Sequence, residues 1–127
     1  MIPNTHLGID TGLCGAPGEL SDGRASVRLV TTEAMAVDDR GLVHGGFVFG
    51  AVDHAAMLAV NDPNVVLGGA DVRFKAPVRV GEQVTCSARV TGEKGRKRLV
   101  EVEARVGDTV VLAGLLTCFV LEQHVLD

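Results

Sequence analysis

The stretch from Val43 to Asn61 limits the fold of this chain more than any other part of it. After Gly46 nearly every residue up to Val60 is apolar or small. A helix that is apolar on all sides is buried inside a larger structure. At about 1.5 Å per residue the run is about 22 Å long, which is too short to span a bilayer comfortably. The sequence therefore predicts the central helix of a soluble core.

Length and composition indicate one cytoplasmic domain. The chain has 127 residues and a net charge of −4, which argues against nucleic-acid binding by bulk charge. The spacing of Cys14, Cys86 and Cys118 fits neither a zinc site nor a disulfide framework, and Cys86 and Cys118 are expected in the core. Residues 1–10 lack the pattern of a signal peptide, so reduced thiols in the cytoplasm are the simplest expectation.

The remaining sequence predicts strands around the helix. Residues 1–18 are rich in Gly, Pro, Asn and Thr and are expected to form an irregular arm, and residues 91–98 a basic turn. The stretch 110–121 is almost continuously apolar, which is typical of a strand covered on both faces. Alternating or apolar runs predict strands at 24–32, 65–75, 84–90, 99–106 and 110–121. This order indicates an α+β domain with one helix on an antiparallel sheet.

Three features resemble the hotdog-fold acyl-CoA thioesterases, in particular the phenylacetate-pathway type. The first is His44-Gly45-Gly46 with Asp53 farther along the same apolar helix, and the second is the strand and bend of residues 74–82. The third is the order of strand, helix and strands. The resemblance implies a single hotdog domain over residues 19–127, with a long central helix wrapped by an antiparallel sheet of about five to six strands. It also implies a homodimer, often a tetramer of two dimers, acting on acyl-CoA with no bound cofactor and no metal.

The glycines and Asp53 carry the expected chemistry. A helix N-terminus offers unpaired N–H groups, and Gly45 and Gly46 allow a ligand to approach the backbone. An N–H aimed at a developing oxyanion is typically worth about 3–4 kcal/mol; the alternative is that the glycines only allow a tight helix entry. Asp53 is expected to activate water as a base or to attack the thioester, unless it is an interface residue capped by hydrogen bonds. His44 either orients the thioester or supports the helix entrance.

Helix geometry makes a shared site the favoured arrangement. Asp53 lies about 10 Å along the helix from Gly46, so one carbonyl cannot contact both in one chain. Two antiparallel helices across a two-fold axis would bring Gly46 of one subunit near Asp53 of the other. His54 points about 100° away from Asp53 and is expected to pack in the core or an interface. This counts against a hydratase, which needs a converging Asp/His pair.

Basic residues are the candidates for coenzyme A binding. Four of them fall within five positions near the start of the expected 99–106 strand, and a second group surrounds the 74–82 bend. Each is either a contact for phosphates or a solvated cluster. Phe47 is expected in the core or in the acyl pocket. The substrate-binding candidates are Phe47, Arg73, Lys75, Arg79, Lys94, Arg96, Lys97 and Arg98.

Three functions remain open from the sequence. The favoured one is a thioester hydrolase that releases a free acid and coenzyme A. The first rival is a hotdog enoyl-CoA hydratase or dehydratase. The second is a protein that binds acyl-CoA without catalysis, as a sensor or scaffold. In each case the expected partner is a small-molecule acyl-CoA, and neither nucleic acid nor membrane is expected as a partner.

Overall fold

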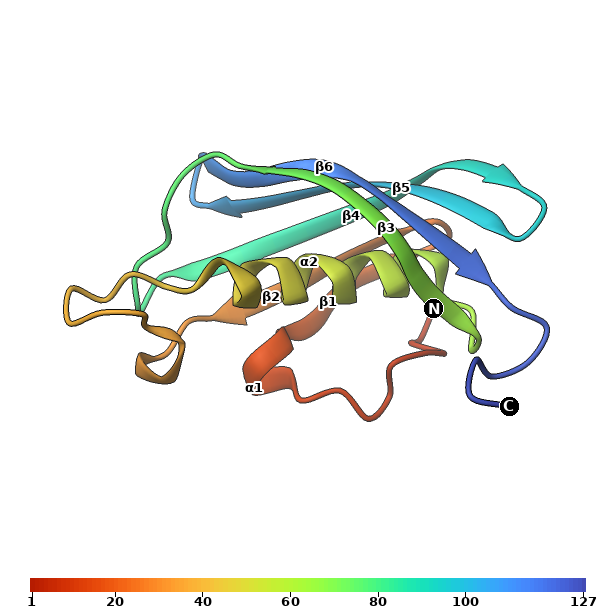
Figure 1. Cartoon of the computed structure of the whole chain (residues 1–127), viewed down its shortest axis with the longest axis horizontal. Helices are drawn as coiled ribbons and strands as arrows, with labels where there is room; N and C mark the ends of the chain where they lie inside the picture. The colour runs from red at the N-terminus through yellow and green to blue at the C-terminus, as the bar shows by residue number, and fades with distance from the viewer.

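One long helix lies against a single antiparallel sheet that curves over it (Figure 1). The computed structural model describes residues 1–127. The sheet has six strands in the order β1-β2-β4-β5-β6-β3, so β1 and β3 are its edges. The elements are α1 (Thr11–Cys14), β1 (Ala16–Ser21), β2 (Arg24–Val30), the 3₁₀ turn η1 (Glu33–Met35), α2 (Gly45–Val60), β3 (Val65–Phe74), β4 (Gln83–Lys94), β5 (Lys97–Val106) and β6 (Thr109–Val120).

The apolar helix predicted from the sequence is α2, and most of it is buried. Its buried residues are Val48, Ala51, Val52 and the run 54–59. The helix ends at Asn61, which adopts a left-handed conformation with φ 54° while its N–H donates to the carbonyl of Met57. Asn tolerates this conformation better than most residues, and Pro63 prevents the helix from continuing. None of the helices combines the length and apolarity needed to cross a membrane.

The inner face of the sheet supplies the other half of the core. Val27 lies opposite Cys86, and Ala88 lies opposite Val102, so successive strands bury their inward residues in register. These side chains are all buried against α2. Burying each Val or Leu is worth about 1.5–3 kcal/mol. The alternation predicted for β2, β4 and β5 is therefore confirmed, and so is the core placement of Cys86 and Cys118.

The prediction for β6 was wrong in one respect. Leu112, Leu116 and Cys118 on its inner face are fully buried, as expected. Its outer face is open, and Leu115 there is 38% exposed. A continuous apolar run in a sequence does not reveal whether both faces are covered within the same chain. The basic turn was also too long, because β4 and β5 extend to a two-residue loop at Gly95 and Arg96.

Residues 1–18 contain more regular structure than their composition suggested. Asp10 caps α1 by accepting hydrogen bonds from the N–H groups of Gly12 (2.9 Å) and Leu13 (3.1 Å). Strand β1 then pairs with β2 and crosses the expected arm–domain boundary at residue 18. The expectation of an irregular arm was wrong here because β1 is an edge strand exposed at nearly every position. Such a strand has no buried face and therefore shows no alternation.

Two side chains of α2 hold the N-terminal arm, residues 1–15, against the back of the helix. His54 and Asn61 are seven residues apart and therefore lie on the same helix face. His54 is buried, as predicted, and its Nδ1 donates to the carbonyl of Cys14 at 3.1 Å. The Asn61 amide donates to the carbonyl of Ile2 (3.0 Å) and accepts from the N–H of Asn4 (2.7 Å).

We expect Asn61→Gly to loosen the arm without straining the end of the helix. Glycine keeps the left-handed conformation but removes both hydrogen bonds, each worth about 1 kcal/mol. Amide exchange at Asn4 should accelerate roughly tenfold, while amides of β4 and β5 keep their protection. Asn64→Gly is the matched control, because the Asn64 side chain makes no hydrogen bond to the arm. Unchanged exchange at Asn4 would show that the amide does not hold the arm.

Candidate active site

The entrance to α2 is fixed by hydrogen bonds to two neighbouring segments. The N–H of Val43 donates to the carbonyl of Val78 (2.9 Å), and the N–H of His44 donates to the carbonyl of Met35 (2.9 Å). Val78 and Met35 are themselves buried. The backbone that leads into the glycines is therefore held on both sides.

Two backbone donors at this entrance are free. The N–H of Phe47 donates to the carbonyl of His44 (3.1 Å), whereas the N–H groups of Gly45 and Gly46 have no acceptor in the chain. Gly45 is half-buried and Gly46 is exposed. Unpaired N–H groups with the positive end of the helix dipole behind them attract an oxyanion. The geometry fits the expected oxyanion donors.

His44 stands beside these donors as the N-cap residue of α2. It is exposed, makes no capping hydrogen bond with its side chain, and lies edge-on to Phe47 with ring centroids 6.1 Å apart. A Cβ placed on Gly46 would lie 2.9 Å from Nε2 of His44. The imidazole therefore covers the approach to Gly46 and is free to turn toward a ligand. Phe47 is half-buried and packs against the core.

Asp53 is the one buried side-chain acceptor without a partner. Its Oδ1 is buried and receives no hydrogen bond. Burial raises the pKa of Asp53 from its ordinary value of 3.8 to about 6. A buried carboxylate left unpaired costs free energy, so the position calls for a functional reason.

Two thiols are close enough to Asp53 to feel its charge. Burial is the main cause that raises the pKa of the Cys118 thiol to about 11, and the Asp53 charge adds to it. The pKa of Cys14 is also raised, by burial, by Asp10 and then by Asp53. His54, the next residue along α2, is turned away and bonded to the arm. No cation within the chain neutralises the Asp53 carboxylate.

Gly46, Gly50 and Asp53 occupy one face of α2. Steps of four and seven residues rotate by about 40° and −20° around the helix, so the three positions are aligned. A Cβ on Gly50 would meet nothing within 4 Å. Packing inside this chain therefore does not require a glycine there. The structure keeps Gly46 and Asp53 about two turns apart and does not bring them together within one chain.

An apolar cavity of about 410 Å³ adjoins the glycines. Its walls come from the start of α2, the end of β3, the bend that follows and the start of β6. Phe74 is 57% exposed at this cavity, and a Cβ on Gly45 would lie 3.2 Å from its ring. The lining residues are Val43, Gly45, Val48, Phe74, Lys75, Ala76, Pro77, Val78 and Val111. The bend at Pro77 was the only sequence signal for it.

The two basic groups predicted to bind substrate lie at opposite ends of the molecule. Arg73, Lys75 and Arg79 are exposed near the N-terminal end of α2, whereas the β4–β5 hairpin reaches past its C-terminal end (Figure 1). The structure therefore does not bring the two groups together in one chain.

Within the hairpin the charges are partly matched. Arg96 pairs with Glu122, and Arg98 pairs with Glu93 at 3.2 Å. The exposed Lys94 and Lys97 have no acidic partner. The net positive charge of the tip therefore comes from the two lysines.

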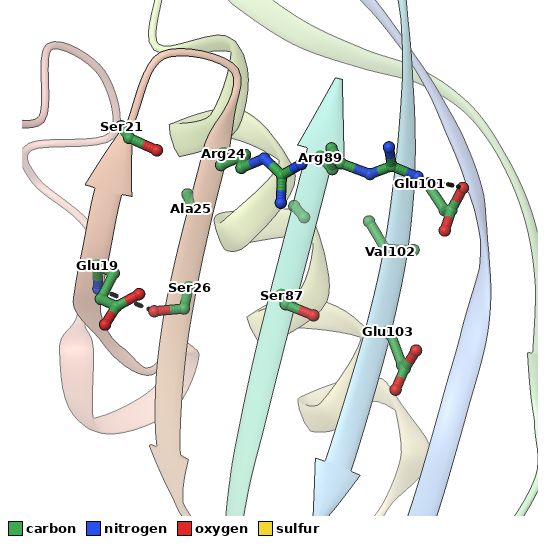
Figure 2. A pocket seen from close by; sticks show the side chains of 11 residues that line it. Glu19, Ser21, Arg24, Ala25, Ser26, Ser87, Arg89, Glu101, Val102 and Glu103 are labelled. Carbon is green, nitrogen blue, oxygen red and sulfur yellow. Dashed lines mark hydrogen bonds and ion pairs between the residues drawn. The ribbon is translucent and has the colours of Figure 1, made fainter. Parts of the chain in front are cut away.

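A second hollow, of about 290 Å³, lies on the outer face of the sheet and is separate from these groups (Figure 2). Ser26 and Ser87 lie opposite each other on β2 and β4, and their small side chains leave the middle of the hollow unfilled. Arg89, opposite Arg24, forms an exposed ion pair with Glu101 at 3.3 Å. Exposed pairs of this kind contribute little stability. None of the predicted site residues lines this hollow.

Comparison with known proteins agrees with the fold. The thioesterase superfamily matches residues 40–113, which include the glycines, Asp53 and the bend after β3. The chain belongs to the thioesterase superfamily, and its one long helix wrapped by an antiparallel sheet is the hotdog fold.

Two relatives have different names. The chain is 51% identical over 119 residues to the methylthioribose-1-phosphate isomerase of Aquifex aeolicus, covering 93% of this chain and 26% of that protein. It is 27% identical over 113 residues to the transcription factor FapR of Caldanaerobacter subterraneus, covering 86% of this chain and 56% of FapR. The chain thus spans about a quarter and about half of the length of these relatives.

Solved structures resemble the chain over most of its length. An uncharacterized protein from Pyrococcus horikoshii is 49% identical, with complete coverage of both chains and a TM-score of 0.97. The phenylacetic acid degradation protein PaaI from Thermus thermophilus is 25% identical, with a TM-score of 0.78 over 86% of this chain and 95% of that chain. The resemblance to the phenylacetate-pathway type is therefore confirmed at the level of fold and superfamily.

The raised pKa of Asp53 predicts how stability changes with pH. Between about pH 4 and 6 the folded protein keeps the Asp53 proton that the unfolded chain has released, so this carboxyl lowers stability as the pH rises. Asp53→Asn removes this pH-dependent loss of stability. Relative to the parent protein it should gain about 1–3 kcal/mol of unfolding free energy between pH 4 and pH 7. Urea titrations of both proteins at pH 4.5, 6 and 8 measure the difference in unfolding free energy between variant and parent. A difference that does not change with pH would contradict the raised pKa.

Proposed function

We propose that the protein hydrolyses the thioester of an acyl-CoA at sites shared by two subunits. The observation that carries this proposal is the buried, unpartnered carboxylate of Asp53. Superfamily membership supports the same reaction class. A carboxylate that needs only to stabilise the fold would be paired, whereas a base or nucleophile needs a free lone pair.

The free N–H groups of Gly45 and Gly46 supply the other half of the chemistry. In the base route, Asp53 takes a proton from water as the water oxygen attacks the thioester carbon. The N–H groups bind the resulting oxyanion; the carbon–sulfur bond then breaks, and the sulfur takes the proton from Asp53 and leaves as the thiol of coenzyme A. In the nucleophile route, a carboxylate oxygen attacks the carbonyl carbon first, the carbon–sulfur bond breaks with loss of coenzyme A thiolate, and water then cleaves the resulting anhydride to regenerate Asp53 and release the acid, with the water proton going to the thiolate. A pKa near 6 suits a base that works at neutral pH.

A second copy of the chain would bring together the two groups that lie too far apart in one chain. Gly46, Gly50 and Asp53 lie along one face of α2 with open space in front of Gly50, and the neighbouring edge strand β3 pairs only with β6. An antiparallel α2 of a partner subunit laid on this face would place its Gly46 beside Asp53. The same arrangement brings the Lys94 and Lys97 tip of one subunit to the end where the partner's helix begins. Either basic group would then be in reach of the coenzyme A phosphates.

The rival functions are weighed against the same residues. The match to a transcription factor favours a second candidate, a domain that binds acyl-CoA without cleaving it. Such a domain needs no base, so the cost of burying Asp53 argues against it. For a hydratase, His54 is unsuitable because it is buried and turned toward the carbonyl of Cys14 in the N-terminal arm, so it does not converge with Asp53. The isomerase name belongs to a protein of which this chain covers only 26%.

We expect the purified protein to release free thiol from acyl-CoA substrates, and Asp53→Asn to lose about 10²–10⁴-fold of the rate. The rate constant kcat/KM of the parent should rise with pH through about 6 and then level off, because only ionised Asp53 acts. An enoyl-CoA hydration assay runs alongside. Hydration without thiol release would identify the hydratase. Tight acyl-CoA binding with neither reaction would identify the binding protein.

Complementation tests the shared site. Gly46→Pro removes one N–H donor, and the Cβ it adds would meet only the exposed His44 side chain. When Asp53→Asn and Gly46→Pro subunits exchange at random, about half of the dimers are mixed. Each mixed dimer holds one undamaged site, so about a quarter of the native sites should return. If labelled subunits exchange and both variants fold, yet activity stays at the level of either parent, each chain builds its own site.

A further inference from the structure

The cavity beside Gly45 has the composition of a site for a hydrocarbon chain. Its floor is formed by Val43, Val48, Val78 and Val111, each at most 5% exposed. Lys75, exposed at the rim, is the only side chain in the lining that can form a hydrogen bond. A hydroxyl or carboxyl group inside this cavity would lose its hydration without finding a partner on the floor.

The position of the cavity connects it to the proposed reaction. Gly45 forms part of its wall, and the N–H groups of Gly45 and Gly46 are the free donors at the helix entrance. Gly45 lines the cavity and Gly46 is the next residue, so a thioester carbonyl bound to either N–H group places its acyl chain at the cavity mouth. Phe74 stands at this mouth with more than half of its surface exposed.

We propose that this cavity binds the acyl chain and that the substrates are CoA esters of acids with several carbons whose acyl group carries no polar substituent. This inference rests on the proposed function, because it takes the glycine N–H groups as the place of the thioester. Each buried methylene contributes about 0.8 kcal/mol, which corresponds to a factor of about four in binding. Affinity should therefore rise steeply with chain length until the cavity is full.

The chain offers a substitution that fills the cavity and a matched control. Ala76 lies in the bend after β3, partly buried, with its methyl group in the lining. Ala76→Phe adds an aromatic ring to the cavity. Ala16→Phe makes the same change at an exposed position of the edge strand β1, which contributes nothing to this cavity.

The experiment measures binding in an Asp53→Asn background, so that turnover does not interfere. Dissociation constants are measured by calorimetry for acetyl-, butyryl-, hexanoyl-, octanoyl- and adipoyl-CoA. We expect roughly fourfold tighter binding per methylene, and hexanoyl-CoA to bind at least tenfold more tightly than adipoyl-CoA, which carries a terminal carboxylate. Ala76→Phe should reduce the ratio of hexanoyl to acetyl affinity at least tenfold, and Ala16→Phe should preserve it.

Other results overturn the assignment. Affinity that does not depend on chain length, or adipoyl-CoA binding as tightly as hexanoyl-CoA, would place the acyl group elsewhere. If Ala76→Phe does not fold, Phe74→Ala tests the same cavity, and an unchanged chain-length profile in that variant counts against it. Absence of thiol release by the parent protein would defeat the proposed function, yet the binding series would still decide what the cavity holds.

Discussion

The burial of α2 beneath the sheet is the constraint on which the rest of the structure depends. An apolar helix cannot remain in water, so β2, β4 and β5 wrap their inward side chains around it. The same burial removes water from Asp53, which lies in the middle of this helix, and raises its pKa to about 6. The force that assembles the core therefore also brings the pKa of this carboxyl close to neutral pH, as the proposed role in proton transfer requires.

Most of the fold was predictable because it follows from periodicity. The helix began within one residue of the expected position, and the alternating runs became β2, β4 and β5 with the expected faces inward. The wrong predictions concern strands in which burial produces no alternation of apolar and polar residues. β1 is exposed at nearly every position, and β6 is apolar on a face that this chain leaves open. Local composition does not report contacts that depend on distant segments.

The site was predictable to the extent that it belongs to one helix. The spacing from the glycines to Asp53 fixed their separation, and the structure agrees that they do not meet in one chain. The hydrogen-bond state of each group was not predictable. That the N–H groups of Gly45 and Gly46 are free depends on the positions of Met35 and Val78, which come from other segments. The exposure of Phe74 likewise depends on where β3 ends.

The groups left unsatisfied by this chain are concentrated on one side of α2. Two free N–H donors, a carboxylate oxygen without a donor, and the β3 edge all surround the same face. A single subunit has no means of satisfying them, because the donors and the acceptor lie about 10 Å apart on a rigid helix. In the proposed dimer, a two-fold axis beside that helix would supply each group with its complement from the partner subunit and leave room for a water and a thioester between them. On this proposal, dimerisation and catalysis follow from the same unpaired groups.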